Sequence, residues 1–390
     1  MIWRAWVVAL LLLAGCGGSG SSPAPPQRGD LVSITSTTSI DVAAVNAYIA
    51  ALAALGVNTS ALSGTKYGVS LHRIVYRTIT PDGRSINASG VLAYPLKVAG
   101  ASSPMLSYQH GTIFQDIDAP SVATNGDPVL VALAGSGFIV AMPDYTGYAA
   151  STVEIHTYMH AQGLAAATVD MLRAARRLLA NNSVATNGQL FLTGYSEGGY
   201  VTLAAQKEME QNLPAEFPIT ASMPAAGPYD MSATARHMVG LTTNPYPVFI
   251  GFIFKAYDHW YGWNRLNDIF KPPYNTVVAT YYDGSRTGGA ISGALTTNSA
   301  DLFSTTFRTG FLGSGEAAIK ADFAKNDIYN WAPSRPTRLF HGQADDVVPY
   351  FNATTAQAAM TLAGSTSVTV QACTTVPPIP PDIPNAAGTI

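Results

Sequence analysis

Gly194-Tyr195-Ser196-Glu197-Gly198-Gly199 lies between a run of strand type, residues 189–193, and a helical run, residues 200–209. A serine flanked by glycines at a strand-to-helix turn matches G-x-S-x-G, the nucleophile elbow. Glycines on both sides let the strand and the helix pass without Cβ clashes, while the serine is held in a strained conformation. We therefore interpret Ser196 as a nucleophile; the alternative is a plain turn with a serine that caps the helix.

The composition narrows the class of protein. The chain has 390 residues, of which 47% are hydrophobic and 12% are charged, and its formal net charge is -3. That length suits one large α/β domain with an insertion, or two domains. The small, mixed charge and the lack of a basic tract argue against a nucleic-acid partner.

The N-terminus has the features of an export signal. Arg4 is followed by an apolar run, residues 5–14, which is too short to span a bilayer as a permanent helix. The run ends in Leu13-Ala14-Gly15-Cys16, which resembles a bacterial lipobox. By that resemblance Cys16 would be lipidated and would anchor an exported protein to a membrane. The alternative is ordinary cleavage near Gly17, which would release a secreted protein.

Strands alternate with helices along most of the chain. Strands are expected at residues 67–80, 86–95, 105–112, 137–145, 189–193, 221–229, 337–342 and 367–373, and helices at residues 39–56, 164–181 and 200–209. The first two strands form an antiparallel hairpin around the turn Pro81-Asp82-Gly83-Arg84 and are placed at the edge of a larger sheet. The later alternation predicts an α/β fold with a mostly parallel sheet, flanked by helices on both faces.

Residues 231–334, between the expected strands at 221–229 and 337–342, form a long segment that is rich in aromatic residues. Its aromatic residues are Tyr246, Phe249, Phe252, Phe254, Tyr257, Trp260, Tyr261 and Trp263. We interpret it as an inserted cap that supplies apolar walls and excludes water from a site. The alternative is a buried helical subdomain with no role in binding.

These patterns divide the chain into a series of segments. They are a signal peptide and lipobox (1–16), a flexible linker (17–38), a core in two parts (39–230 and 335–373), the cap (231–334) and an irregular tail (374–390).

A serine nucleophile needs a base, and the base needs an orienting acid. The segment from His341 to Pro349 places Asp345 and Asp346 in a loop after a late strand. Only one of two adjacent carboxylates can point at the site, so we predict that Asp345 is the acid and that Asp346 is solvated.

A tetrahedral intermediate also needs backbone donors for its oxyanion. We predict the N–H groups of Glu197, at the start of the helix, and of Thr112, in the loop after an early strand. His110 is interpreted as a structural hydrogen-bonding residue. The Glu197 side chain is expected only to complement the helix dipole.

From residue 67 to residue 349 the chain resembles the α/β-hydrolase serine esterases, in particular their secretory-lipase-like branch. The resemblance rests on Tyr108-Gln109-His110-Gly111-Thr112, Pro143-Asp144-Tyr145 with His156 downstream, Gly194-Tyr195-Ser196-Glu197-Gly198-Gly199, Gly227-Pro228-Tyr229-Asp230 and His341-Gly342-Gln343-Ala344-Asp345. It implies an α/β-hydrolase fold and hydrolysis of carboxylic esters, including acylglycerols, through an acyl-enzyme on Ser196. It also implies that no metal or cofactor takes part.

The sequence departs from this family at the catalytic histidine. The resemblance implies a histidine after Asp345 in the chain, and none is present there. All seven histidines precede Asp345, and Cys373, which has no partner in the mature chain, is followed by a proline-rich stretch. We therefore expect a truncation or frame shift just after Cys373. The rival is that His110, His156 or His259 supplies the base, which stays unassigned.

Two alternative functions remain open. One is a serine peptidase on the same scaffold, which an aromatic cap disfavours because peptide termini call for polar or charged partners. The other is a hydrolase-like surface lipoprotein that has lost its activity with the histidine. The partners expected for the favoured interpretation are a small-molecule or lipid ester and, through the anchor, a membrane.

Overall fold

The computed structural model describes residues 27–62, 64, 66–123 and 127–374. The predicted signal peptide with Cys16, and the tail beyond residue 374, lie outside the described residues. Within them, no helix combines the length and the apolar character needed to cross a bilayer.

A nine-stranded sheet forms the centre of the molecule, with the strands in the order β1-β2-β3-β5-β4-β6-β7-β8-β9. Its strands are β1 (Leu31–Ile40), β2 (Val69–Ile79), β3 (Ser85–Pro95), β4 (Ser102–Gln109), β5 (Ile139–Pro143), β6 (Ala185–Tyr195), β7 (Ala221–Ala225), β8 (Thr337–Gly342) and β9 (Val368–Cys373). The first four strands in that order pair antiparallel, and every pair from β5 to β9 is parallel. The predicted α/β fold with a mostly parallel sheet is confirmed.

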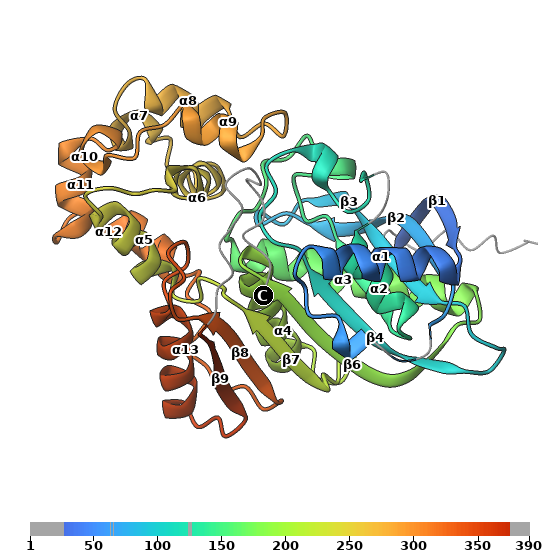
Figure 1. The fold of residues 1–390 in the computed structure, drawn as a ribbon. Helices are drawn as coiled ribbons and strands as arrows, with labels where there is room; N and C mark the ends of the chain where they lie inside the picture. Colours follow the sequence, from blue (N-terminus) through green and yellow to red (C-terminus); the bar gives the residue numbers. More distant parts are fainter. Residues whose placement is uncertain (1–26, 63, 65, 124–126, 375–390) are drawn as a thin grey trace, which may run out of the picture.

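Helices flank this sheet and form a second group beside it (Figure 1). They are α1 (Val42–Ala54), α2 (Pro128–Gly135), α3 (Ala161–Asn181), α4 (Glu197–Asn212), α5 (Met231–Gly240), α6 (Pro247–Trp260), α7 (Leu266–Ile269), α8 (Tyr274–Thr280), α9 (Gly288–Gly293), α10 (Ser299–Leu302), α11 (Thr305–Leu312), α12 (Ala317–Ala324) and α13 (Phe351–Leu362), with short 3₁₀ turns at Ser60–Leu62, Asp116–Asp118 and Ala149–Ser151. The patterns along the sequence did not indicate α2 or α13.

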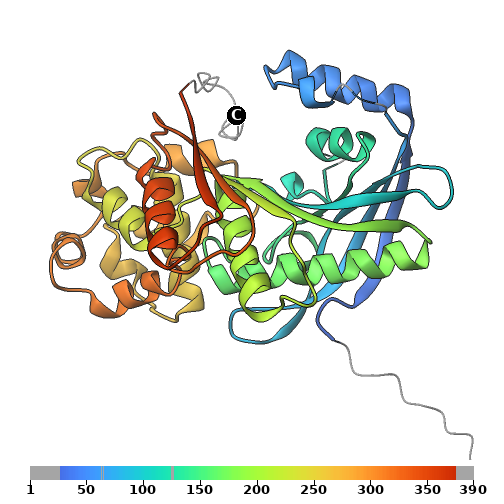
Figure 2. The ribbon, with the colours of Figure 1, turned by 90° about the horizontal axis from the view of Figure 1, so that it is seen from below.

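Alternate side chains of β3 point to opposite faces of the sheet. Val91 packs with Leu130 of α2, whereas its neighbour Leu92 packs with Leu172 of α3. Both faces of the strand are therefore covered, and Figure 2 shows α2 and α3 on opposite sides of the sheet. This two-sided burial explains why the central strands contain continuous apolar runs.

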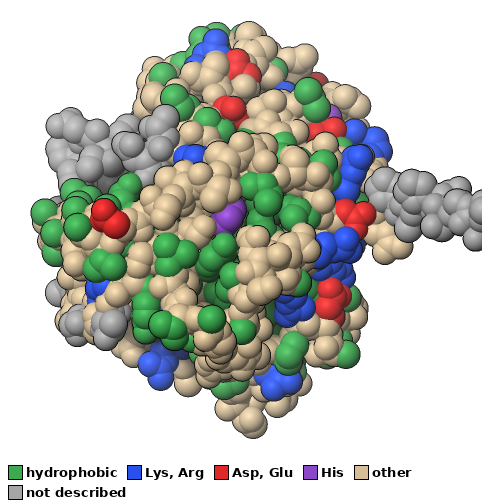
Figure 3. Space-filling model, turned by 90° about the vertical axis from the view of Figure 1, so that its right-hand side faces the viewer, with side chains coloured by type: hydrophobic (Ala, Val, Ile, Leu, Met, Phe, Trp, Pro, Cys, Tyr) green, Lys and Arg blue, Asp and Glu red, His purple; other side chains and the backbone are tan. Residues whose placement is uncertain are grey.

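The N-terminal segment corrects the predicted linker. Residues 31–38, assigned to a flexible linker, belong to β1, which pairs antiparallel with β2. Just before the strand, Arg28 bonds the buried carboxylate of Asp170 at 3.0 Å, and Asp30 pairs with Arg177 at 2.7 Å. In Figure 3, where the chain is seen from the side of β1, basic and acidic side chains lie next to one another. The sequence patterns did not predict β1, because polar side chains on both of its faces remove the alternation of apolar and polar residues that is typical of a strand.

The helices α5 to α12 lie between β7 and β8 in the chain, at the upper left of Figure 1. Their centre is the fully buried ring of Phe254. Six other rings lie within 6.2 Å of it, centroid to centroid: Trp263, Phe270, Phe303, Phe307, Phe311 and Phe323. Much of the aromatic content of this region therefore forms its own core rather than walls for a ligand.

Candidate active site

Ser196 lies at the tip of the turn between β6 and α4. Its backbone has φ 57° and ψ −121°, a combination that L-residues rarely adopt. Such a conformation costs about 1–3 kcal/mol and persists only where the surroundings enforce it. The side chain makes no capping hydrogen bond to α4, so Ser196 is not the plain helix cap that was the alternative.

The glycines around Ser196 are required by close backbone contacts. A Cβ on Gly198 would lie 2.0 Å from the carbonyl oxygen of Gln109, and one on Gly194 would lie 2.6 Å from the same oxygen. A Cβ on Gly199 would lie 2.0 Å from the carbonyl oxygen of Ala225. The expected reason for the glycines, passage of a strand and a helix without Cβ clashes, is confirmed.

The loop after β4 runs beside the predicted nucleophile. A Cβ on Gly111 would lie 3.9 Å from the Cβ of Ser196. The next residue, Thr112, shares a 2.9 Å hydrogen bond between its Oγ1 and the hydroxyl of Tyr158. Among the described residues, none accepts a hydrogen bond from the N–H of Thr112 or from that of Glu197. Both predicted oxyanion donors thus lie near Ser196 with their protons unengaged.

The environment of the Glu197 side chain differs from the one expected from the sequence. It is fully buried rather than exposed at the helix terminus, and its Oε1 lies 2.7 Å from Nε2 of His156. A buried carboxylate must be paired with an opposite charge or strong donor, and His156 is that partner. The expectation that Glu197 only complements the helix dipole is therefore wrong.

The predicted acid lies in the loop after β8. Oδ1 of Asp345 accepts hydrogen bonds from the N–H groups of Val347 and Val348, at 3.0 and 2.9 Å. Asp346 is exposed, and its Oδ2 accepts a hydrogen bond from the hydroxyl of Tyr246 at 3.0 Å. Asp345 is thus the more enclosed of the two.

His341 lies directly beneath this loop. Its Nε2 donates to the carbonyl of Val348 at 2.7 Å and lies 3.6 Å from Oδ2 of Asp345. Burial lowers the pKa of His341 and raises that of Asp345, the latter against the opposing effect of the Val348 N–H. His341 therefore acts as a support for the acid loop, since its proton is engaged by the backbone.

Among the described residues, no hydrogen bond or ion pair joins Ser196 to any of the three candidate histidines, His110, His156 and His259. His156 has both ring nitrogens at 2.7 Å from acceptors, so it has no free position to take a proton. His110 donates from Nδ1 to the carbonyl of Gly111, stacks on Tyr145, and has an Nε2 without a partner among the described residues. His259 lies in the last turn of α6, with its ring edge-on to that of Trp260.

The end of β9 reaches the same region. Cys373 pairs with Gly342 of β8, and its carbonyl accepts a hydrogen bond from the N–H of Gln343 at 3.0 Å. Burial, followed by the nearby charges of Asp345 and Cys373, raises the pKa of Tyr195, the neighbour of the predicted nucleophile. The end of β9 consequently lies beside the start of the acid loop.

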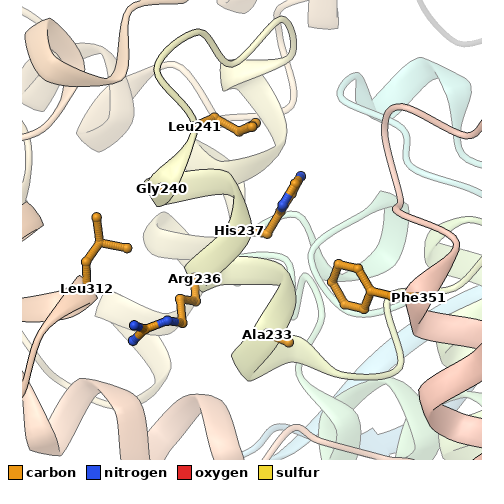
Figure 4. Close-up of a pocket in the computed structure, with 7 residues that line it drawn as sticks. All are labelled: Ala233, Arg236, His237, Gly240, Leu241, Leu312 and Phe351. Carbon is orange, nitrogen blue, oxygen red and sulfur yellow. The ribbon is translucent and has the colours of Figure 1, made fainter.

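A separate groove of about 600 Å³ runs along α5 (Figure 4). Figure 4 shows His237 facing Phe351 on one side of the helix, and Leu312 on the other. None of the predicted site residues lines this groove, so it is distinct from the candidate active site. Within the part of the chain that the structure describes, no three His, Cys, Asp or Glu side chains group as metal ligands do.

Sequence reasoning missed two contacts of the site, Glu197 with His156 and Thr112 with Tyr158. Both join segments more than forty positions apart, so no local pattern could show them. The only available signal was the position of His156 shortly after the Pro143-Asp144-Tyr145 motif.

Comparison with known proteins agrees with this geometry. Residues 116–377 match the model of the family described as secretory lipase. No curated protein sequence matches the chain.

Solved structures similar to this chain include the rice cell wall degrading esterase LipA from Xanthomonas oryzae, which is 28% identical. The likeness covers 89% of this chain and 91% of that one, with a TM-score of 0.80. A protein of Legionella pneumophila classed as a hydrolase is 26% identical over 87% and 91% of the two chains, with a TM-score of 0.78.

Lipase A from Candida antarctica is 16% identical over 90% of this chain and 77% of that chain, with a TM-score of 0.64, and shares the fold. The fold is that of the α/β-hydrolases, with an esterase or lipase scaffold. With more than half of its length matched by the family model, this chain belongs to the secretory lipase family.

Proposed function

We propose that the protein is a serine carboxylic-ester hydrolase that acts through an acyl-enzyme on Ser196. The observation that carries the proposal is the strained Ser196 backbone at the tip of the elbow, beside two unengaged amide donors. Strain of this kind is maintained where a side chain must be presented to a ligand. Membership of a lipase family supports an ester, rather than an amide, as the bond that is cleaved.

In the proposed reaction, Oγ of Ser196 attacks the ester carbonyl carbon while a base takes its proton. The N–H groups of Glu197 and Thr112 stabilise the negative oxygen of the tetrahedral intermediate. The intermediate collapses to the acyl-enzyme, and the alcohol leaves with the proton held by the base. Water then attacks the acyl carbon by the same route and releases the acid.

Asp345 orients the base in this scheme, because its Oδ1 is held by two backbone donors while its Oδ2 accepts no hydrogen bond among the described residues. The base stays unassigned, because no histidine follows Asp345 in the sequence. Among the upstream histidines the best candidate is His110, whose Nε2 has no partner among the described residues. His156 and His259 are less suitable, the first because both of its nitrogens are engaged and the second because it lies at the end of a cap helix.

The substrate is proposed to carry an apolar acyl group. Phe114, which follows the oxyanion loop, lies 6.0 Å from Phe249 and 5.6 Å from Phe252 of the cap, measured between ring centroids. Phe249 is only partly buried, so an apolar surface remains at this junction. Esters of plant cell walls are a specific candidate because of the likeness to LipA, and acylglycerols are another.

The family's description as secretory suggests an exported protein. We further propose that Cys16 is lipidated and anchors it to a membrane. Replacement of Cys16 by serine should release the protein from the membrane fraction, and a variant that stays in that fraction would contradict the anchor.

The test of the proposed function is hydrolysis of short-chain and long-chain p-nitrophenyl esters. The wild-type protein should turn over these esters, Ser196→Ala should not, and the exposed control Ser314→Ala should behave as the wild type. A fluorophosphonate should add once, on Ser196. Turnover of aminoacyl p-nitroanilides in preference to esters would favour the peptidase, and no labelling of the folded protein would favour the inactive lipoprotein.

A further inference from the structure

His156 occupies an unusual position for a titratable side chain. It lies in the loop before α3, is 5% exposed, and is surrounded by the rings of Tyr145, Tyr148, Tyr158 and Phe252 at centroid distances of 6.1, 4.6, 5.9 and 5.5 Å. Within this apolar enclosure its Nε2 lies 2.7 Å from Oε1 of the buried Glu197. Removing two titratable groups from water costs free energy, which only close pairing between them offsets.

The two ring nitrogens of His156 have different partners. Nδ1 lies 2.7 Å from the carbonyl of Thr146, which can only accept a hydrogen bond, and Nε2 lies 2.7 Å from Oε1 of Glu197. With a proton in each of these two hydrogen bonds, the ring of His156 links Thr146 to Glu197, the first residue of α4. A ring held in this way serves to position other groups, and it does not exchange protons with Ser196.

The contact between His156 and Glu197 lies beside the predicted oxyanion hole. Glu197 directly follows the predicted nucleophile, and its own N–H is a predicted oxyanion donor. A buried, unpaired carboxylate on that residue would oppose the negative charge that develops on the substrate oxygen, because the low-polarity surroundings screen little. The hydrogen bond with Nε2 of His156 satisfies one oxygen of this side chain and fixes the residue that carries the amide.

The second donor is held by the same short segment. The hydroxyl of Tyr158 lies 2.9 Å from Oγ1 of Thr112, and the Tyr158 ring stacks on Phe252 of the cap at 4.3 Å. His156 and Tyr158 are two positions apart, and each contacts one of the two residues whose amides face the site.

We propose that the segment His156-Thr157-Tyr158 is a positioning element for the oxyanion hole, with His156 holding Glu197 while Tyr158 holds Thr112. The inference rests on the proposed ester hydrolysis and extends it to two residues that do not touch the reacting atoms. It also explains why Glu197, unlike most first-turn acidic residues, is buried.

The kinetic test uses His156→Gln and Tyr158→Phe. His237→Gln changes an exposed histidine, and Tyr76→Phe removes a buried hydroxyl whose hydrogen bond goes to Ala167. His156→Gln should lower kcat roughly 10- to 1,000-fold with little change in KM, and Tyr158→Phe should lower kcat less. Both controls should keep kcat within about twofold, although Tyr76→Phe should lose stability comparable to Tyr158→Phe.

The charge of Glu197 supplies a rescue test. In the His156→Gln background, Glu197→Gln removes the unbalanced carboxylate and should recover part of the lost kcat, so the two changes should be non-additive. A double variant whose losses simply add, or a His156→Gln protein with unaltered kcat, would overturn the inference.

A readout that needs no turnover separates this inference from the proposed function. With selectively ¹⁵N-labelled glutamate and threonine, the amide signal of Glu197 should shift in His156→Gln and that of Thr112 in Tyr158→Phe, while His237→Gln leaves both unchanged. If esters are not hydrolysed but these shifts occur, the proposed function fails and the positioning role stands. Unchanged amide signals would overturn the positioning role whatever the activity.

Discussion

At Ser196 and Asp345 the surrounding structure determines the conformation of a single residue. Asp345 and Asp346 are identical in chemistry and adjacent in the chain, yet the loop turns one toward two backbone donors and the other toward solvent. The choice of Asp345 as the acid stays a prediction, and the geometry supports it. The same surroundings hold Ser196 in a conformation that an isolated turn would not adopt.

At this scale we predict that Asp345→Asn and Asp346→Asn differ sharply. An asparagine at position 345 cannot stabilise a protonated base, so kcat/KM for a p-nitrophenyl ester should fall by roughly a thousandfold or more. The Asp346 variant should stay within about twofold, since that side chain is solvated. Equal losses in the two variants, with both proteins folded, would show that the acid is assigned wrongly.

Among the elements, α3 depends on a titratable cap. The side chain of His160 accepts a hydrogen bond from the N–H of Gly163 through Nδ1, at 3.3 Å, at the start of the helix. An accepting nitrogen must be unprotonated, and protonation would also place a positive charge at the positive end of the helix dipole. Burial lowers the pKa of His160 to about 4, which agrees with this role.

We predict that this cap makes the folded state sensitive to acid. Between pH 6.5 and about 4 the unfolded chain binds a proton at His160 that the folded chain excludes, so the free energy of unfolding should fall as the pH falls through this window. The loss should be on the order of 3 kcal/mol. His160→Asn keeps a capping oxygen without the titration and should remove most of the loss.

Urea unfolding at pH 7 and at pH 4.5 measures the effect, with His237→Asn as a control that changes an exposed histidine. The control should show the full fall in stability. A His160→Asn protein that loses as much stability as this control would disprove the link between the cap and the acid sensitivity.

For the whole molecule, the question is how the cap is joined to the core. A continuous cluster of buried apolar residues runs from Leu164 of α3 and Tyr200 of α4 into the cap phenylalanines. Polar contacts cross the same boundary: the hydroxyl of Tyr257 donates to the carbonyl of Met159, and that of Tyr200 to the carbonyl of Asn326. The cap in this structure is therefore a packed part of the molecule.

Two phenylalanines on α6 should separate the structural and substrate-binding roles of the cap. Phe254→Ala removes the centre of the aromatic cluster and should destabilise the protein by about 3–5 kcal/mol, with little effect on KM. Phe249→Ala should change stability much less and raise KM for long-chain esters, because its partly buried ring faces Phe114. Thermal unfolding and ester kinetics of both variants test this, and a KM unchanged by Phe249→Ala would argue against an acyl-binding wall at that position.

Short-range sequence patterns were sufficient to predict the fold class and the position of the turn at Ser196. The apolar runs and helical repeats around Ser196 act over a few residues, so their spacing can be read directly from the chain. The same holds for β8, predicted at residues 337–342 and found at Thr337–Gly342. These features depend on neighbours along the chain, whose distances the covalent backbone fixes.

Only the tertiary structure decided the features that join distant segments. It recruited Leu31–Ile40 into the sheet as a polar edge strand, buried Glu197 against His156, and turned Asp345 rather than Asp346 inward. Each outcome depends on which surfaces meet after folding, where one hydrogen bond or ion pair excludes the alternatives. Short-range periodicity carries no record of such contacts, because they form between residues that the chain itself keeps apart.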